Sequence, residues 1–137
     1  MAVNAKLGAG TTLSITTDGG TTYTQINGVD SLGATGQTKP EVDITSLEDT
    51  SKQYIAGIND GESKSITVKW DETDAGQEAL AAEAKAGNVA GFKINFANGK
   101  SATFDMVLLG WTVDDVSNES AMTATVTGRM TGDIAWA

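Results

Sequence analysis

Residues 92–104 read FKINFANGKSATF, and this stretch decides the fold of the 137-residue chain. In its first half apolar residues alternate with polar ones, which is the period of a strand with one buried face. Asn98-Gly99 then provides the strongest short signal for a β-hairpin, because both residues tolerate the positive φ angles of a type I′ turn. The return strand is predicted over Ala102–Leu109. The centre of the chain is therefore predicted to be an antiparallel hairpin.

Strand patterns recur on both sides of this hairpin. Thr11–Thr17 and Thr21–Ile26 flank the turn sequence Asp18-Gly19-Gly20, which predicts a second hairpin. Ser63–Trp70 alternates apolar with polar residues and predicts a half-buried strand. Ala121–Thr131 predicts the last strand, with small and apolar residues on one face and mostly threonines on the other.

One helix is predicted, over Ala75–Ala86. Asp74 is placed to cap its first turn, Gln77 to bond back to the cap backbone, and Gly87 to end the helix in the left-handed conformation. Leu80 belongs to a narrow apolar stripe completed by alanines, which is typical of a helix that lies on a sheet.

Chain length and the positions of glycine-rich, polar segments indicate how the rest of the chain is divided. Residues 1–10 are small and polar and predict a flexible N-terminal arm, followed by a single β domain over residues 11–137. From Gly33 to Asp60, glycines and polar residues interrupt every pattern, so a long inserted loop is predicted at 33–62, and loops of this length are often functional. The predicted fold class is mainly β: an antiparallel β-sandwich or partly closed barrel with one flanking α-helix.

Composition excludes most chemistry. The net charge is -9, which opposes tight binding of nucleic acid, and the chain contains neither cysteine nor histidine. The acids Asp71-Glu72-Thr73-Asp74 fit a capped helix start better than a calcium loop, and Asp114-Asp115 point apart rather than forming a catalytic pair. No catalytic residue, metal site or cofactor is predicted, and the chain is not expected to be an enzyme. No apolar run approaches the roughly 20 residues of a membrane span, so we expect a soluble protein made in a cytoplasm.

Several motifs together resemble one family. DITSLEDT at 43–50, QYIAGINDGES at 53–63 and DAGQEAL at 74–80 occur in this order, followed by the central hairpin and the closing threonine-rich strand. In order and spacing they resemble the tail tube (major tail) proteins of long, non-contractile-tailed bacteriophages of the lambda-like type, the siphoviruses. The resemblance covers roughly the whole chain.

The resemblance implies a structural protein of the virion tail, assembled in the cytoplasm of the bacterial host. In this family hexameric rings stack into a hollow tube that conducts viral DNA during ejection, and each subunit adds about four strands to a continuous inner barrel. It also implies tape-measure, tail terminator and tail tip proteins as partners, and no membrane. Roughly twenty-four strands tilted near 45° give a backbone circumference of roughly 160 Å and a bore of roughly 40 Å, wider than duplex DNA.

Two sets of residues are candidates for assembly. The threonine face of the last strand is a possible lumen lining that would not hold DNA, although the period alone fits an ordinary exposed face equally well. The inserted loop is expected to reach a neighbouring subunit or ring, the alternative being a loop folded back on its own core. The lumen candidates are Thr123, Thr125, Thr127 and Thr131, and the loop candidates are Leu47, Tyr54, Ile55 and Ile58.

Two other function classes stay open at this point. A monomeric β-sandwich binding module, of the adhesin or carbohydrate-binding type, predicts a persistent monomer with a saturable ligand. An enzyme would require a pair of carboxylates brought together in a pocket.

Overall fold

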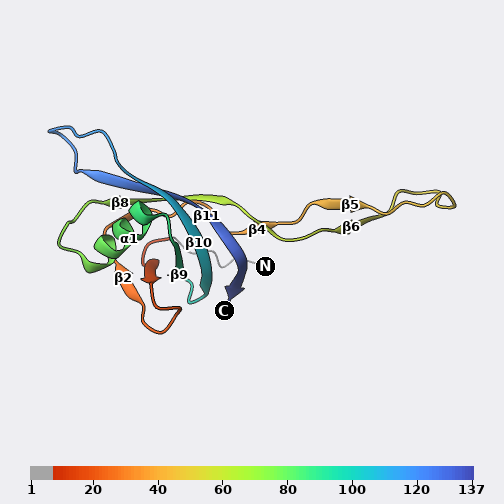
Figure 1. The fold of residues 1–137 in the computed structure, drawn as a ribbon, viewed down its shortest axis with the longest axis horizontal. Coiled ribbons are helices and arrows are strands. Elements are labelled where there is room, and N and C mark those ends of the chain that lie inside the picture. The colour runs from red at the N-terminus through yellow and green to blue at the C-terminus, as the bar shows by residue number, and fades with distance from the viewer. Residues whose placement is uncertain (1–7) are drawn as a thin grey trace, which may run out of the picture.

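The computed structural model describes residues 8–137, so most of the predicted N-terminal arm, residues 1–7, lies outside the described residues. One seven-stranded sheet, two short two-stranded ribbons and one helix make up the described fold (Figure 1). Their bounds are β1 Thr12–Thr16, β2 Thr24–Ile26, β3 Val29–Ser31, β4 Gln37–Thr38, β5 Glu41–Asp43, β6 Tyr54–Ala56, β7 Asp60–Gly61, β8 Ser63–Lys69, α1 Ala75–Ala86, β9 Val89–Asn95, β10 Ser101–Val113 and β11 Thr123–Trp136.

The large sheet is antiparallel and curls back on itself. Its strand order is β2-β1-β9-β10-β11-β8-β3, so the two edge strands are β2 and β3. These edges follow one another in sequence, joined by Asn27-Gly28 alone. A sheet whose opposite edges are two residues apart along the chain must close most of the way round. The predicted class, mainly β with a partly closed barrel and one helix, is confirmed.

The core fills the inside of this curled sheet. Phe92 of β9 and Phe104 of β10 stack with their ring centres 5.8 Å apart, and both are buried. The alternation predicted for β8, β9 and β11 is observed as alternating buried and exposed side chains. The buried hydrophobic residues include Leu13, Ile15, Ile26, Ile66, Val68, Leu80, Ile94, Met106, Leu108 and Val126.

Helix α1 packs against β10, β2 and β1, and its predicted bounds and cap are confirmed. The Asp74 carboxylate accepts from the Gln77 backbone N–H at 3.0 Å, and Gly87 ends the helix at φ 73°. The role predicted for Gln77 is wrong. Its buried side chain accepts from the Asp71 N–H and donates to the carbonyls of Asn27 and Lys69, at 2.9, 2.6 and 2.9 Å respectively. This amide joins the helix start to the ends of β2 and β8.

The central hairpin is confirmed, but the type I′ turn is wrong. Gly99 has φ 86°, whereas Asn98 does not have a positive φ, and the Gly99 N–H donates to the Phe96 carbonyl at 3.1 Å. This is a three-residue turn, a type I turn followed by a glycine bulge. A two-residue turn would have shifted the register by one and paired Phe92 with Asp105. The observed register pairs Phe92 with Phe104 and keeps both rings in the core.

Strands β10 and β11 are longer than the sequence predicts. Gly110 was expected to end the return strand. Instead Leu109 forms a bulge, with no partner residue in β11, and β10 continues to Val113. Beyond the bulge, Trp111 and Val113 pair with the buried residues of β11 instead of ending the sheet. The register of β11 against β10 shifts between Thr131 and Ala135, where Gly132 has φ 74°, and β11 continues to Trp136.

The inserted segment is not an irregular loop. Residues 33–62, called the extension below, form a long hairpin that projects from the body, with β4 paired to β7 near the body and β5 paired to β6 farther out (Figure 1). The strand signals were missed because these strands are only two or three residues long and lie between polar residues. The body alone does not bury this segment.

Candidate self-assembly surfaces

The outer part of the extension is a ribbon with one apolar face. Val42 of β5 pairs with Ile55 of β6, and the Ile44 N–H donates to the Gln53 carbonyl at 3.0 Å in the same register. Paired residues and residues two apart share a face, so Val42, Ile44 and Ile55 lie together. All three are 41–51% exposed. Apolar groups gathered on an uncovered ribbon are typical of a protein–protein contact.

All four residues predicted in the loop are exposed. Leu47 lies in the turn at the tip, where Ser46 and Asp49 bond to each other, and it is fully exposed. Ile55 lies on the apolar face, whereas Tyr54 lies on the opposite face, and Ile58 lies near the body with 87% exposure. The alternative of a loop folded back on its own core is wrong for these side chains. Val42 and Ile44 were missed, and their spacing of two was the available signal.

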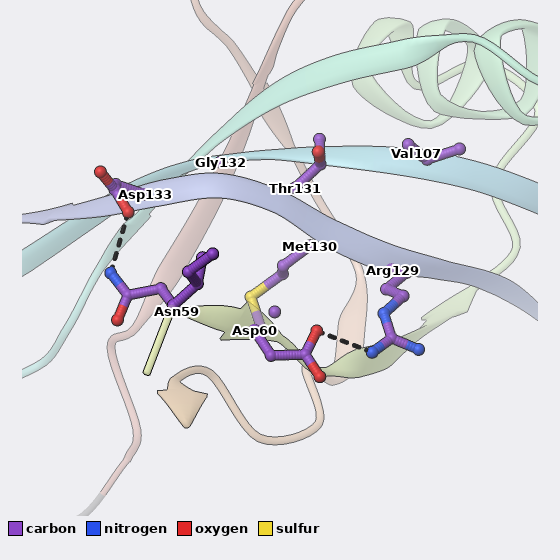
Figure 2. Close-up of a pocket in the computed structure, with 10 residues that line it drawn as sticks. Asn59, Asp60, Val107, Arg129, Met130, Thr131, Gly132 and Asp133 are labelled. Carbon is purple, nitrogen blue, oxygen red and sulfur yellow. Dashed lines mark hydrogen bonds and ion pairs between the residues drawn. The ribbon is translucent and has the colours of Figure 1, made fainter. Parts of the chain in front are cut away.

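The root of the extension lies along β11 and leaves an open crevice of about 500 Å³ (Figure 2). Asn59 donates to the Asp133 carboxylate at 3.0 Å, and the Arg129 guanidinium donates to the Asp60 carboxylate at 2.9 Å. Figure 2 shows the Met130 side chain between these two pairs. Other lining residues are Ile58, Gly61, Val107, Thr131 and Gly132.

The other strand of the root is held by two side chains that the sequence analysis did not identify. Lys64 of β8 is only 2% exposed and donates to the carbonyls of Gly33 and Ala34 and to the Thr35 hydroxyl. Burial lowers the pKa of Lys64 to about 8, so the amine is still mostly charged at neutral pH. The Gln37 amide donates to the Gly132 carbonyl at 2.6 Å and accepts from the Ile134 N–H.

The four candidate lumen threonines share the outer face of β11. Thr127 and Thr131 are exposed, whereas Thr123 and Thr125 are half-buried, and both of their hydroxyls donate to the Asp114 carboxylate. The Thr125 hydroxyl also lies 3.4 Å from that of Thr67 on β8. This face is rich in hydroxyl groups, as the period predicted.

Cations on this face have partners. Arg129 pairs with Asp60, and Lys69 lies 3.5 Å from the Asp30 carboxylate. On β9, the Lys93 ammonium lies 5.9 Å from the centre of the Tyr23 ring. The outer face of β8, β9 and β11 therefore presents hydroxyls, two ion pairs and one lysine beside an aromatic ring, rather than a basic track.

The acidic clusters have local structural roles. Asp71 accepts from the hydroxyl and the N–H of Thr73, which lowers the pKa of its carboxyl, and Asp74 caps α1. Within residues 8–137, no three acidic, cysteine or histidine side chains gather into a group suited to a metal ion. Among the same described residues, no helix has the length and apolar character needed to cross a membrane.

Comparison with known proteins gives a match over nearly the whole chain. The family model described as lambda phage tail tube protein, TTP, matches residues 9–137. No curated protein matches this chain.

Solved structures show the same fold at low sequence identity. A chain in the tail of an empty gene transfer agent particle, computed with C6 symmetry, has a TM-score of 0.75 and 16% identity, with 97% of this chain and 99% of that chain covered. The SPP1 tail tube protein has a TM-score of 0.70 and 13% identity, with 92% of this chain and 75% of that chain covered. A chain of the anti-feeding prophage baseplate has a TM-score of 0.72 and 12% identity, with 100% of this chain and 97% of that chain covered.

Proposed function

The chain belongs to the lambda phage tail tube protein family, and from this premise we propose how this structural subunit of the virion tail assembles. Copies of the chain join head to tail into hexameric rings, and the rings stack into the hollow tube that conducts viral DNA during ejection. The observation that carries this proposal is the extension, because its apolar face is left uncovered by the subunit that bears it.

In this proposal the extension docks on a neighbouring copy of the chain, in the same ring or the next. Val42, Ile44 and Ile55 are then covered by the neighbour, together with Leu47 at the tip of the extension, whereas Tyr54 lies on the other face of the ribbon. A contact between unlike patches of identical subunits propagates from copy to copy, so it closes rings or builds filaments. The net charge of -9 opposes premature association of free subunits.

The lumen is proposed to be lined by the outer face of the four neighbouring strands β9, β10, β11 and β8. Thr123, Thr125, Thr127 and Thr131 then face the DNA. A duplex carries one negative charge per roughly 1.7 Å and is held by unpaired cations through release of counterions. The pairing of Arg129 with Asp60 and of Lys69 with Asp30 supports a wall along which DNA slides.

The remaining expectations extend this proposal. The tube is assembled in the cytoplasm of a bacterial host, and its ends bind tape-measure, tail terminator and tail tip proteins. The subunit does no enzymatic chemistry, since its work is fully accounted for by assembly and conduction.

Negative-stain electron microscopy of concentrated protein tests the proposal. Hollow rods or six-membered rings are expected. In limited proteolysis, residues 1–10 and the tip of the extension are cut in the monomer and protected in the tube. A concentrated sample that stays monomeric, with equal cutting under all conditions, would contradict the proposal. A monomer that also binds a ligand saturably would point to the binding module instead.

A further inference from the structure

Lys64 occupies a position that the pattern of β8 reserves for an apolar residue. It is buried in a strand whose buried and exposed side chains alternate strictly at this point. All three ammonium hydrogens have an oxygen acceptor, on Gly33, Ala34 and Thr35, at 3.3, 3.1 and 2.7 Å. Desolvating a charge is costly, and an apolar residue of the same length would suit the core better. Stability of the body is therefore a poor explanation for this lysine.

The three acceptors of Lys64 are consecutive residues at the point where the chain leaves the body. Two are backbone carbonyls, so the contact fixes the path of the main chain and not only a side chain. Two residues farther on, Gln37 bonds to two backbone groups of β11. The Gln37 amide donates to one backbone group of β11 and accepts from another. It thus makes the pair of hydrogen bonds that the backbone of a neighbouring strand would make with β11.

The returning strand of the extension is fastened to the same part of β11. The Met130 N–H donates to the Glu62 carbonyl at 3.1 Å, and Asn59 bonds to Asp133. Gly61 lies so close to β11 that a Cβ on this residue would overlap the Met130 carbonyl. Both strands of the root are therefore held by the body, whereas the outer ribbon β5–β6 is supported only by its own pairing (Figure 1).

We propose that Lys64 and Gln37 are positioning residues that fix the direction of the extension in the free subunit, before any neighbour is present. The proposal rests on the proposed function in one respect, namely that the extension contacts another copy of the chain. An isolated two-stranded ribbon is marginally stable and would swing if its root were loose. If the direction of the extension is already fixed, less conformational entropy is lost when each subunit is added. The affinity between subunits is then higher without any additional contact.

The absence of cysteine from the chain makes a direct test possible. Spin labels are attached to two introduced cysteines, Glu41→Cys in the extension and Asn98→Cys in the central turn, and distances are measured by pulsed electron resonance on dilute monomer. In the otherwise unchanged protein we expect one narrow distance distribution. Lys64→Met removes the three hydrogen bonds and keeps an unbranched side chain only one atom shorter, and it is expected to broaden the distribution about twofold or more.

Matched control substitutions distinguish loss of the root contacts from a general effect of substitution on the protein. Lys85→Met removes an exposed lysine from the last turn of α1 and is expected to leave the distribution unchanged. Gln37→Ala is expected to broaden it, whereas Gln25→Ala, at an exposed position of β2, is not. If Lys64→Met fails to fold, Gln37→Ala and Thr35→Val still test the proposal. Distributions as narrow as the parent in all folded root variants would overturn it.

Assembly provides the second readout. In unlabelled protein, Lys64→Met and Gln37→Ala are expected to raise the lowest concentration that forms tubes by about tenfold, with the melting temperature little changed. If the parent protein forms no tubes, the proposed function fails, but the distance distributions still decide whether these residues position the extension. Broad distributions combined with unchanged tube formation would overturn the claim that a preset direction assists assembly.

Discussion

At the scale of single residues, buried polar side chains connect segments that the sheet alone leaves loose. Gln77 is the clearest example, because its amide bonds to the backbone of Asn27, Lys69 and Asp71. Those groups come from the loop between the two sheet edges, the end of β8 and the turn before α1. A single side chain thus ties the closure of the barrel to the helix that covers it.

Removing that side chain is expected to be costly. Gln77→Ala leaves two carbonyls and one N–H without their partners, and we expect the free energy of unfolding to fall by about 2–4 kcal/mol. Urea denaturation followed by circular dichroism measures the loss. Gln25→Ala, on an exposed side chain, serves as the control and is expected to change stability by less than about 0.5 kcal/mol. Equal effects of the two substitutions would refute the role assigned to Gln77.

Lys64 makes stability depend on pH in a defined direction. Burial lowers its pKa from 10.5 to about 8 in the folded protein, and its hydrogen-bond acceptors are uncharged oxygens. Between these two pH values the unfolded chain binds more protons than the folded one, so the stability contribution of this group rises as pH rises.

Denaturation of the parent and of Lys64→Met at pH 7.5 and pH 10 isolates this effect. We expect the parent to gain stability relative to the variant at the higher pH, because the other titrating groups are common to both proteins. A difference between the two proteins that stays constant with pH would show that the amine keeps its ordinary pKa when buried.

At the scale of elements, the extension has two faces with different expected roles. Val42→Ser combined with Ile55→Ser removes apolar surface that the monomer leaves exposed, so the stability of the monomer should stay within about 0.5 kcal/mol of the parent. Tube formation should be lost, since the proposed docking face is gone. Light scattering and microscopy measure assembly.

The control for this variant is on the other face of the same ribbon. Ala56→Ser replaces a residue of β6 that points away from Val42 and Ile55, and it is expected to leave tube formation intact. Normal tubes from the double serine variant would show that the apolar face does not carry the contact.

Elements with a sustained period were predictable from the sequence, and those shaped by tertiary register were not. The alternation around Phe92 and the caps of α1 are local, so the strand and the helix followed directly. The turn at Asn98-Gly99 was misjudged because its length is set by the need to bring Phe104 opposite Phe92. Gly110 looked like a strand end, since a bulge that lets a strand continue depends on its partner.

The candidate surfaces were only partly predictable for a similar reason. Leu47 and Ile58 were identified because they are apolar residues in a polar segment. Lys64 was not, because a lysine at an alternating position is ordinarily exposed and its acceptors lie about thirty residues away in sequence. The pairing of Arg129 with Asp60 likewise joins segments that local patterns do not connect.

At the scale of the whole molecule, the scarcity of unpaired cations on the outer face leads to a prediction about DNA. Thr127→Lys adds an unpaired cation to the proposed lumen face of β11, where the native side chain is exposed. Tubes should still form, and encapsulated or threaded duplex DNA should be retained at low salt and released as salt is raised. The measurement is retention of labelled DNA by tubes across a salt series.

Thr127→Gln is the matched control, since it adds length without charge. It should release DNA as the parent does at every salt concentration. Equal retention by the lysine and glutamine variants would place Thr127 away from the DNA path.

The fastening of the extension to β11 also orders events during synthesis. Ninety-five residues separate Gln37 from Gly132, so the ribosome produces the projecting hairpin long before the strand on which its base rests. On the proposed function, a nascent chain whose β11 has not yet emerged lacks an extension of fixed direction, and so does a truncated product without β11. Such incomplete polypeptides are then expected to be excluded from the growing tail.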